Sequence, residues 1–259
     1  MRALIAFAFL LAPARAAAEC SAAASRPAEL LRAGQAVDAH LVAEVLLAVC
    51  PDAAAAESWR IADALALHRL DEHERARARL AQVAGPRAGV LVAWSYLDAG
   101  DRQAYRSAAR ALSPEAAARL AVLAAVDDGE AFRATSAQLD AALREASGHA
   151  HAEYRRARGK SPTAAALLSA VLPGAGQAYA GSWQAAGIAF VLNAVLIGAT
   201  VELADHELYL GAATTGLAAS VFYVGNILNA ADLAERRNDV ASRPSYRALE
   251  ELLVPEASP

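Results

Sequence analysis

Two long stretches without a charged side chain constrain this sequence more than any other feature. The first runs from 161 to 201, the second from 208 to 231, and a short polar segment separates them. A bilayer core of about 30 Å is crossed by roughly 20 apolar residues in a helix. The sequence therefore predicts a transmembrane helical hairpin. The alternative is a buried helical pair in a soluble Ala-rich protein, which is disfavoured because uncharged soluble helices seldom run this long.

The predicted membrane module covers 161–237, with transmembrane helices at 183–201 and 208–233. A helix at 161–172 comes before them, and its length of about 18 Å makes it a half-helix that is too short to cross. Ser161 can cap this helix, and Pro162 suits its first turn because the missing N–H costs nothing there. Trp183 and Tyr209 are expected at the two membrane interfaces, as in aromatic belts.

A glycine-rich turn at 173–182 has the pattern Pro-Gly-x-Gly-Gln-x-Tyr-x-Gly. The pattern consists of Pro173, Gly174, Gly176, Gln177, Tyr179 and Gly181. With the following hairpin it resembles an entry motif of small bacterial membrane proteins, a family of largely unassigned function that often carries tetratricopeptide-like repeats. The module also resembles, more loosely, factors that accompany the insertion of membrane proteins, which implies a role in that process. Glycines permit tight turns, and the Gln and Tyr side chains can satisfy backbone carbonyls that such turns leave unpaired in lipid.

Small and polar residues recur every three or four positions on the second transmembrane helix, which suits close helix contact. They are Ala212, Gly216, Ala219, Tyr223, Asn226 and Ala230. With a loop centred at 204–205, Asn193 is expected level with Gly216. The same register predicts one polar cluster made of Gln177, Tyr179, Tyr223 and Asn226.

The first 18 residues have the pattern of a secretory signal peptide: Arg2, an apolar run, and small residues before a cleavage site at Ala18. An uncleaved signal is the alternative. Export would place Cys20 and Cys50, the two cysteines of the chain, in an oxidising compartment. A disulfide between them would stabilise the fold by about 3 kcal/mol; the alternative is a pair of free buried thiols.

Residues 19–160 are predicted to form a soluble, repeat-like domain of helical hairpins, so that the whole chain is all-α. Apolar residues recur there at spacings of three and four. One stripe is Leu41, Val45, Leu46 and Val49, and another is Trp59, Ala62, Leu65 and Ala66. Corners at 70–73, 97–100 and 126–129 each end one helix and begin the next, with Gly or Asp at the turn.

Several of these positions resemble the tetratricopeptide repeat family over about 52–145. The matching residues include Trp59, Leu70, Ala76, Leu80, Trp94, Tyr96, Gly100, Tyr105 and the closing prolines Pro86 and Pro114. The corners lie closer together than the family's repeat length of about 34 residues. The resemblance implies a scaffold that binds a protein partner. The alternative is a compact spacer without a ligand.

The sequence offers no motif for catalysis, a cofactor or a metal. His149 and His151 are two residues apart and lie on different sides of a helix. A net charge of −4 without a basic stripe gives no support to nucleic-acid binding. The chain is therefore expected not to be an enzyme.

The basic residues around the membrane module complicate its orientation, because positive charges prefer the cytoplasmic side. Four of them precede it, at Arg155, Arg156, Arg158 and Lys160, and Arg236 and Arg237 follow it. A third partial or full crossing through 164–179 would reconcile most of them with export. The tail, 238–259, is expected to hold a short helix at 246–253 followed by disorder.

The function expected is that of a bacterial inner-membrane protein whose N-terminal domain lies in the periplasm and binds a protein partner. The outer membrane remains an alternative location. An alternative function is a component of a small oligomeric transporter or channel, with a path lined by Asn193, Asn226 and Gln177. In that case the hairpin would form a homo-oligomer in the lipid bilayer.

Overall fold

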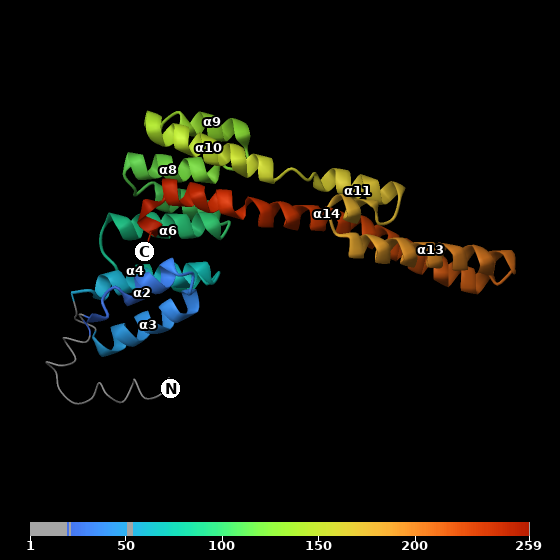
Figure 1. Ribbon diagram of the computed structural model, residues 1–259, viewed down its shortest axis with the longest axis horizontal. Helices are drawn as coiled ribbons and strands as arrows, with labels where there is room; N and C mark the ends of the chain where they lie inside the picture. The colour runs from blue at the N-terminus through green and yellow to red at the C-terminus, as the bar shows by residue number, and fades with distance from the viewer. Residues whose placement is uncertain (1–19, 21, 51–53, 259) are drawn as a thin grey trace. The chain divides into compact units, whose positions relative to one another are not determined.

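The computed structural model describes residues 20, 22–50 and 54–258, and every regular element in these ranges is a helix. The all-α fold class is thus confirmed for the described residues, while the predicted signal peptide, 1–18, lies outside them. The chain divides into two compact units (Figure 1). The first ends at Ser147 and includes the chain again from Leu249, and the second is Gly148–Ala248. The expected boundary at 160 therefore falls inside the second unit.

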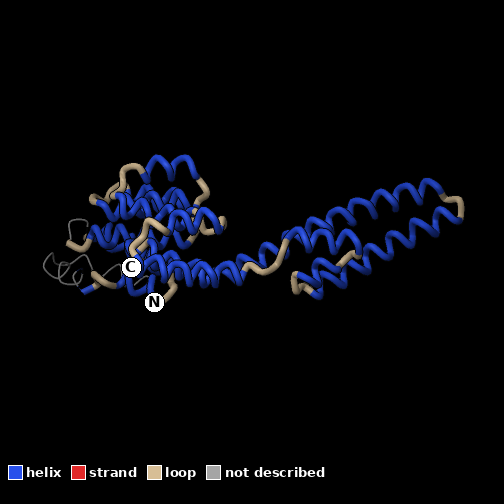
Figure 2. Tube along the Cα trace, turned by 90° about the horizontal axis from the view of Figure 1, so that it is seen from above, coloured by secondary structure: helices blue, strands red, loops and turns tan. Residues whose placement is uncertain are grey.

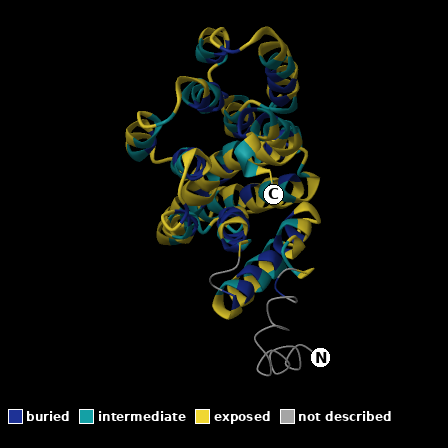
Figure 3. Ribbon diagram, turned by 90° about the vertical axis from the view of Figure 1, so that its left-hand side faces the viewer, coloured by how far each residue is buried: buried dark blue, intermediate teal, exposed yellow. Residues whose placement is uncertain are grey.

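The first unit is built from consecutive short helices that pack on one another. They are α2 (Arg26–Arg32), α3 (Ala36–Val49), α4 (Ala56–Arg69), α5 (His73–Leu80), α6 (Pro86–Asp98), α7 (Arg102–Ala109), α8 (Pro114–Ala124) and α9 (Gly129–Ser136), followed by α10 (Ala141–Ala157), which continues into the second unit. Their buried residues face neighbouring helices and their exposed residues face outward (Figure 3). The predicted series of helical hairpins is present.

The corners between these helices lie where the sequence predicts them. Gly100 has a φ of 76°, and its N–H donates to the Leu97 carbonyl while the Asp101 N–H donates to the Tyr96 carbonyl. This pair of bonds closes α6 with a left-handed residue. Asp71 takes the same conformation after α4, with a φ of 65°. At the third corner the Asp128 carboxylate instead caps the first turn of α9.

The core of the first unit contains one of the two predicted stripes. Trp59 is 1% exposed, and the three other residues of its stripe are buried as well. In the stripe on α3, however, only Leu46 is buried, while Leu41, Val45 and Val49 are exposed. The helix packs against α2 and α4, and these two neighbours cover only part of its surface. The predicted helix is present, and most of its apolar stripe is exposed.

Cys20 and Cys50 form a disulfide bond, with Cα atoms 6.5 Å apart. Both cysteines are buried beside Leu46, Ala56 and Trp59. The bond therefore ties the start of the described chain to the end of α3.

The end of the chain completes the first unit. Helix α14 (Tyr209–Leu253) continues without a break, Pro244 included, and a 3-10 turn, η2 (Pro255–Ala257), follows it. Leu253 and Val254 are fully buried, and the guanidinium of Arg87 donates to the Glu256 carbonyl at 3.1 Å. The expectation of a short helix followed by disorder is wrong, because these apolar residues bury themselves in the first unit.

After the end of α10, the second unit consists of two short helices and a long pair. The short helices are α11 (Pro162–Val171) and α12 (Ala175–Tyr179), and the pair is α13 (Trp183–Asp205) with the first part of α14. Helices α13 and α14 lie side by side and antiparallel, joined by a short loop (Figures 1 and 2). The predicted half-helix and hairpin are both observed as helices.

The register of the pair differs from the prediction. Gly216 faces Thr200 rather than Asn193: a Cβ added to the glycine would lie 3.2 Å from the Thr200 Cγ2 atom. Helix α13 passes the expected end at Val201 and continues to Asp205. The loop therefore lies farther along the chain, and each residue of α14 meets a later residue of α13.

Helices α13 and α14 are the two described helices long and apolar enough to cross a membrane. The apolar windows of the two helices have mean hydropathies of 1.9 and 1.3, and only 6% and 22% of these windows are buried. Helices α11 and α12 are separated by a break at 172–174. A full third crossing by one helix through 164–179 is therefore not formed.

Candidate functional site

The glycine-rich turn places α12 directly between α11 and α13. A Cβ on Gly176 would lie 2.0 Å from the Ala165 carbonyl oxygen, and one on Gly174 would lie 2.4 Å from the Ala186 carbonyl oxygen. Such distances are far inside van der Waals contact, so only glycine fits at these two positions. Pro173, which has no N–H to donate, stands in the break that ends α11.

The side chain of Gln177 is the centre of this module, and it is 1% exposed. Its Nε2 donates to the Asn226 backbone carbonyl at 2.9 Å and also contacts the Asn226 side-chain oxygen. Its Oε1 accepts from the Ser169 hydroxyl at 2.9 Å, and the Ser169 oxygen accepts from the N–H of Gly176. One amide thus joins α11, α12 and α14.

The two tyrosines of the predicted cluster bind α11 at its opposite ends. The Tyr223 hydroxyl donates to the Ala170 carbonyl at 2.7 Å, near the end of α11. The Tyr179 hydroxyl accepts from the Ser161 N–H at 3.0 Å, at the start of α11. The structure therefore brings Gln177 and Asn226 together but separates the tyrosines, so the prediction of a single cluster of four was wrong.

Gly181 and Asn193 have separate roles. Gly181 has a φ of 87°, and an added Cβ would lie 2.7 Å from the Arg237 guanidinium. Asn193 is 1% exposed, and its Nδ2 donates to the Ala189 carbonyl of its own helix at 2.8 Å. The Nδ2 of Asn193 is thus bonded within α13, whereas its buried Oδ1 has no hydrogen-bond partner among the described residues.

Asn238 and Asp239 complete the module, and sequence reasoning missed both. The Asn238 side chain exchanges hydrogen bonds with the backbone N–H and carbonyl of Lys160, at 3.0 and 2.6 Å. Asp239 pairs with Arg158 at 2.6 Å. The sequence contained a sign of Asn238, because the stripe of small and polar residues on α14 continues past Ala230 at every fourth position. Those residues are Asn226, Ala230, Ala234, Asn238 and Ser242, all of them buried.

A second polar site, also missed from the sequence, lies at the corner between α4 and α5. The His68 Nε2 atom is 3.2 Å from the Asp98 carboxylate at the end of α6, and the His73 Nε2 atom is 3.9 Å from it. Burial alone would raise the pKa of Asp98. The hydrogen bond from His68 and the charges of both histidines lower it by a larger amount, so the pKa of Asp98 lies below its usual value. The only sign of this site in the sequence is the pair of histidines on either side of the corner. Asp98 is distant from them in the sequence and comes close only because α6 packs against α4 and α5.

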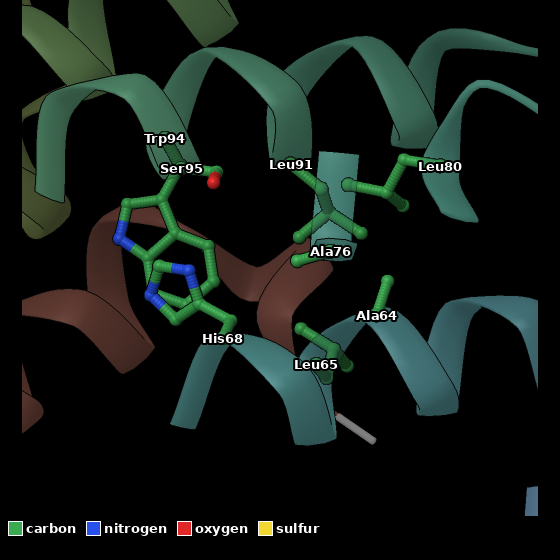
Figure 4. Close-up of a pocket in the computed structure, with 8 residues that line it drawn as sticks. All are labelled: Ala64, Leu65, His68, Ala76, Leu80, Leu91, Trp94 and Ser95. Atoms are coloured by element: carbon green, nitrogen blue, oxygen red, sulfur yellow. The ribbon is translucent and has the colours of Figure 1, made fainter. Parts of the chain in front are cut away.

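Trp94 fixes the orientation of His68. The two rings lie 3.8 Å apart between centroids and 33° from parallel (Figure 4). A cavity beside them has a volume of about 10 Å³, the room that one water molecule needs. It is lined by Ala64, Leu65, His68, Ala76, Leu80, Leu91, Trp94 and Ser95. The cavity is too small for an organic substrate.

A buried ion-pair network joins α3, α4 and α5. The carboxylate of Asp63, which is 0% exposed, lies 2.5 Å from His40 Nδ1 and 2.5 Å from Arg79 Nε. Arg79 also pairs with Glu44 at 2.9 Å. This network is hard to predict from the sequence, because Asp63 lies inside the apolar stripe of α4.

No protein-family model, curated protein sequence or solved structure matches this chain.

Proposed function

We propose that this chain is a non-enzymatic protein of the bacterial inner membrane whose helical hairpins bind a protein partner. The apolar surface of the α13–α14 hairpin carries the proposal. Phe190, Val195 and Leu217 are among its exposed side chains, at 50%, 61% and 69% exposure. The core helix of a soluble protein would bury such residues, whereas lipid covers them at no cost in hydration.

The polar side chains of the membrane module favour a structural role over a transport role. Gln177 and Asn226 bind each other, and Tyr223 binds a carbonyl of α11. These bonds satisfy groups that would cost several kcal/mol if they were left unpaired in lipid. The module therefore acts as an anchor with a short helical pair, α11–α12, fixed to its side.

The two ends of the first unit support two membrane crossings. Arg119 pairs with Glu256 at 2.9 Å, and both belong to the unit that also contains α2–α9. A single compact unit lies on one side of a bilayer, so the chain must cross an even number of times between Ser147 and Leu249. Helices α13 and α14 supply two crossings, in place of the three favoured by the sequence.

The signal-like sequence at 1–18 and the Cys20–Cys50 disulfide support a periplasmic first unit. Two crossings also leave the basic residues on that side, against the usual bias. Several of these charges are bound within the protein, however. Arg158 pairs with Asp239, Arg236 pairs with Asp232, and the Lys160 ammonium lies 4.6 Å from the Tyr179 ring. The two carboxylates offset part of the positive charge that opposes export.

An exposed aliphatic face on α3 supports the binding of a protein partner. Val37, Leu41, Val45 and Val49 follow one another at intervals of four residues and are 56%, 52%, 55% and 42% exposed. A continuous stripe of this kind matches the apolar face of an amphipathic helix. We therefore expect the partner to present such a helix.

Photo-crosslinking in intact cells tests this function. A photoreactive residue at Leu41 should give one discrete protein adduct, whereas the same residue at exposed Glu115 on α8 should give none. Val45→Asp, on the same face, should abolish the Leu41 adduct without changing the amount of protein. If Leu41 gives no discrete adduct, or if Val45→Asp leaves the adduct unchanged, the first unit is a spacer.

A further inference from the structure

We propose that the corner between α4 and α5 binds a divalent transition-metal ion such as Zn²⁺ through His68, His73 and Asp98. Two imidazoles and one carboxylate form a common ligand set for zinc, with further positions left for water or another ligand. The site is independent of the proposed partner binding, since it lies on different helices from the exposed face of α3.

The distances between the ligand atoms fit one ion. One nitrogen from each histidine and one Asp98 oxygen all lie within 4.8 Å of one another. Tetrahedral bonds of about 2.0–2.1 Å place neighbouring ligand atoms roughly 3.4 Å apart. The observed separations from the Asp98 oxygen, 3.2 Å to His68 and 3.9 Å to His73, lie on either side of this value. Binding therefore requires only small side-chain adjustments.

Asp71 provides a fourth oxygen at the same corner. Its left-handed backbone places a carboxylate oxygen 2.9 Å from the Nε2 atom of His73. The Asp71 side chain is 93% exposed and the Asp98 side chain is 31% exposed. The carboxylate side of the corner is thus open to solvent, which gives an ion a path to the two histidines.

The protein already holds the histidines in place. The His68 ring lies against Trp94, with centroids 3.8 Å apart (Figure 4). The His68 and His73 rings meet edge to face, with centroids 4.8 Å apart. Metal sites depend on such support, because the surrounding residues orient the imidazoles before the ion arrives.

The network around Asp63 provides an internal contrast. His40, Glu44 and Asp63 also lie within 4.8 Å of one another. There, however, Arg79 pairs with both carboxylates, and Arg75 lies 3.3 Å from His40 Nε2. These guanidinium groups occupy the place of a cation. Within the described part of the chain, Asp98 forms ion pairs with His68 and His73 and with no guanidinium group.

A metal titration of the full-length protein in detergent tests the proposal. The protein is purified with a tag that contains no histidine, treated with a chelator, and titrated with Zn²⁺ by calorimetry. We expect one saturable ion per chain. Co²⁺ should give the absorption bands of a tetrahedral site, and Zn²⁺ should alter the fluorescence of Trp94, which is stacked on a ligand.

Two ligand variants and one control variant locate the site. Asp98→Asn keeps the shape of the side chain, and His73→Gln removes a ligand; each should weaken Zn²⁺ binding about 10-fold or more. His40→Gln, in the contrasting network, should leave the affinity unchanged. Circular dichroism checks that each variant is folded. Absence of saturable binding in the wild type, unchanged affinity in Asp98→Asn, or an equal loss in His40→Gln would each overturn the proposal.

Discussion

The side-chain amide of Gln177 donates a hydrogen bond to the backbone carbonyl of Asn226 across 2.9 Å. This bond fixes the short helix α12 to the long helix α14 inside a surface that is otherwise apolar. Both partners are buried, at 1% and 8% exposure. Loss of either side chain therefore leaves an unpaired polar group that water does not reach.

Gln177→Leu and Asn226→Leu should each lower the amount of inserted protein. Gln177→Leu removes the amide that binds the Asn226 carbonyl. Asn226→Leu keeps that carbonyl but removes the side-chain oxygen that the same amide contacts. Each change leaves a buried polar group unpaired, at a cost of about 1–3 kcal/mol. The double variant should cost less than the sum of the single changes, because the second change removes a contact that is already broken. Quantitative immunoblots of membrane fractions measure the effect. Gln184→Leu, at an exposed position on α13, is the control and should have no effect; strictly additive losses would argue against the pairing.

Gly176→Ala should destabilise the membrane module by about 2 kcal/mol or more, since its Cβ would overlap the Ala165 carbonyl. Gly187→Ala is the matched control, because no atom lies within 4 Å of its added Cβ. This control should be neutral or stabilise α13 by up to about 1 kcal/mol. Thermal unfolding in detergent compares the two variants. Equal midpoints would show that α12 does not pack tightly against α11.

Gly100→Val should lower the free energy of unfolding of the first unit by about 1 kcal/mol or more. The backbone φ of 76° suits glycine and fits a β-branched residue badly. Gly129→Val, at a corner without a positive φ, should stay within about 0.5 kcal/mol of the wild type. Denaturant unfolding of the full chain provides the measurement. An unchanged midpoint for Gly100→Val would contradict the left-handed corner.

Cysteine labelling should place both ends of the first unit on one side of the membrane. A cysteine at Ser258 should react with an impermeant maleimide in cells whose outer membrane is permeabilised. A cysteine at His206, in the hairpin loop, should react only after the inner membrane is opened. The native disulfide does not react with maleimide, so it can stay in place. If the cysteine at 258 is protected and the one at 206 is labelled from outside, the orientation is opposite to the proposed one. If both are labelled from outside, the two helices do not cross the membrane.

Local chemistry made part of this fold predictable. Charge-free runs marked the hairpin, and glycine or aspartate marked the corners, because backbone conformation and hydropathy act over a few residues. The remaining features depend on tertiary packing and could not be predicted. The register of α13 and α14 depends on where α13 ends, and the helix continues through the charged residues after Val201 to Asp205. The His68–Asp98 contact joins α4 and α6, and no local pattern of three or four residues indicates it.

The return of residues 249–258 to the first unit sets an order of events during synthesis. The ribosome makes these residues after both long helices, yet α6 and α8 use them as part of their packing. The first unit must therefore wait for about 100 further residues, on the order of 10 s at bacterial rates. In the two-crossing topology proposed above, the apolar surface that Leu253 and Val254 cover stays unfilled until α14 is inserted and its end has crossed back. Completion of the first unit would then report that membrane insertion has succeeded.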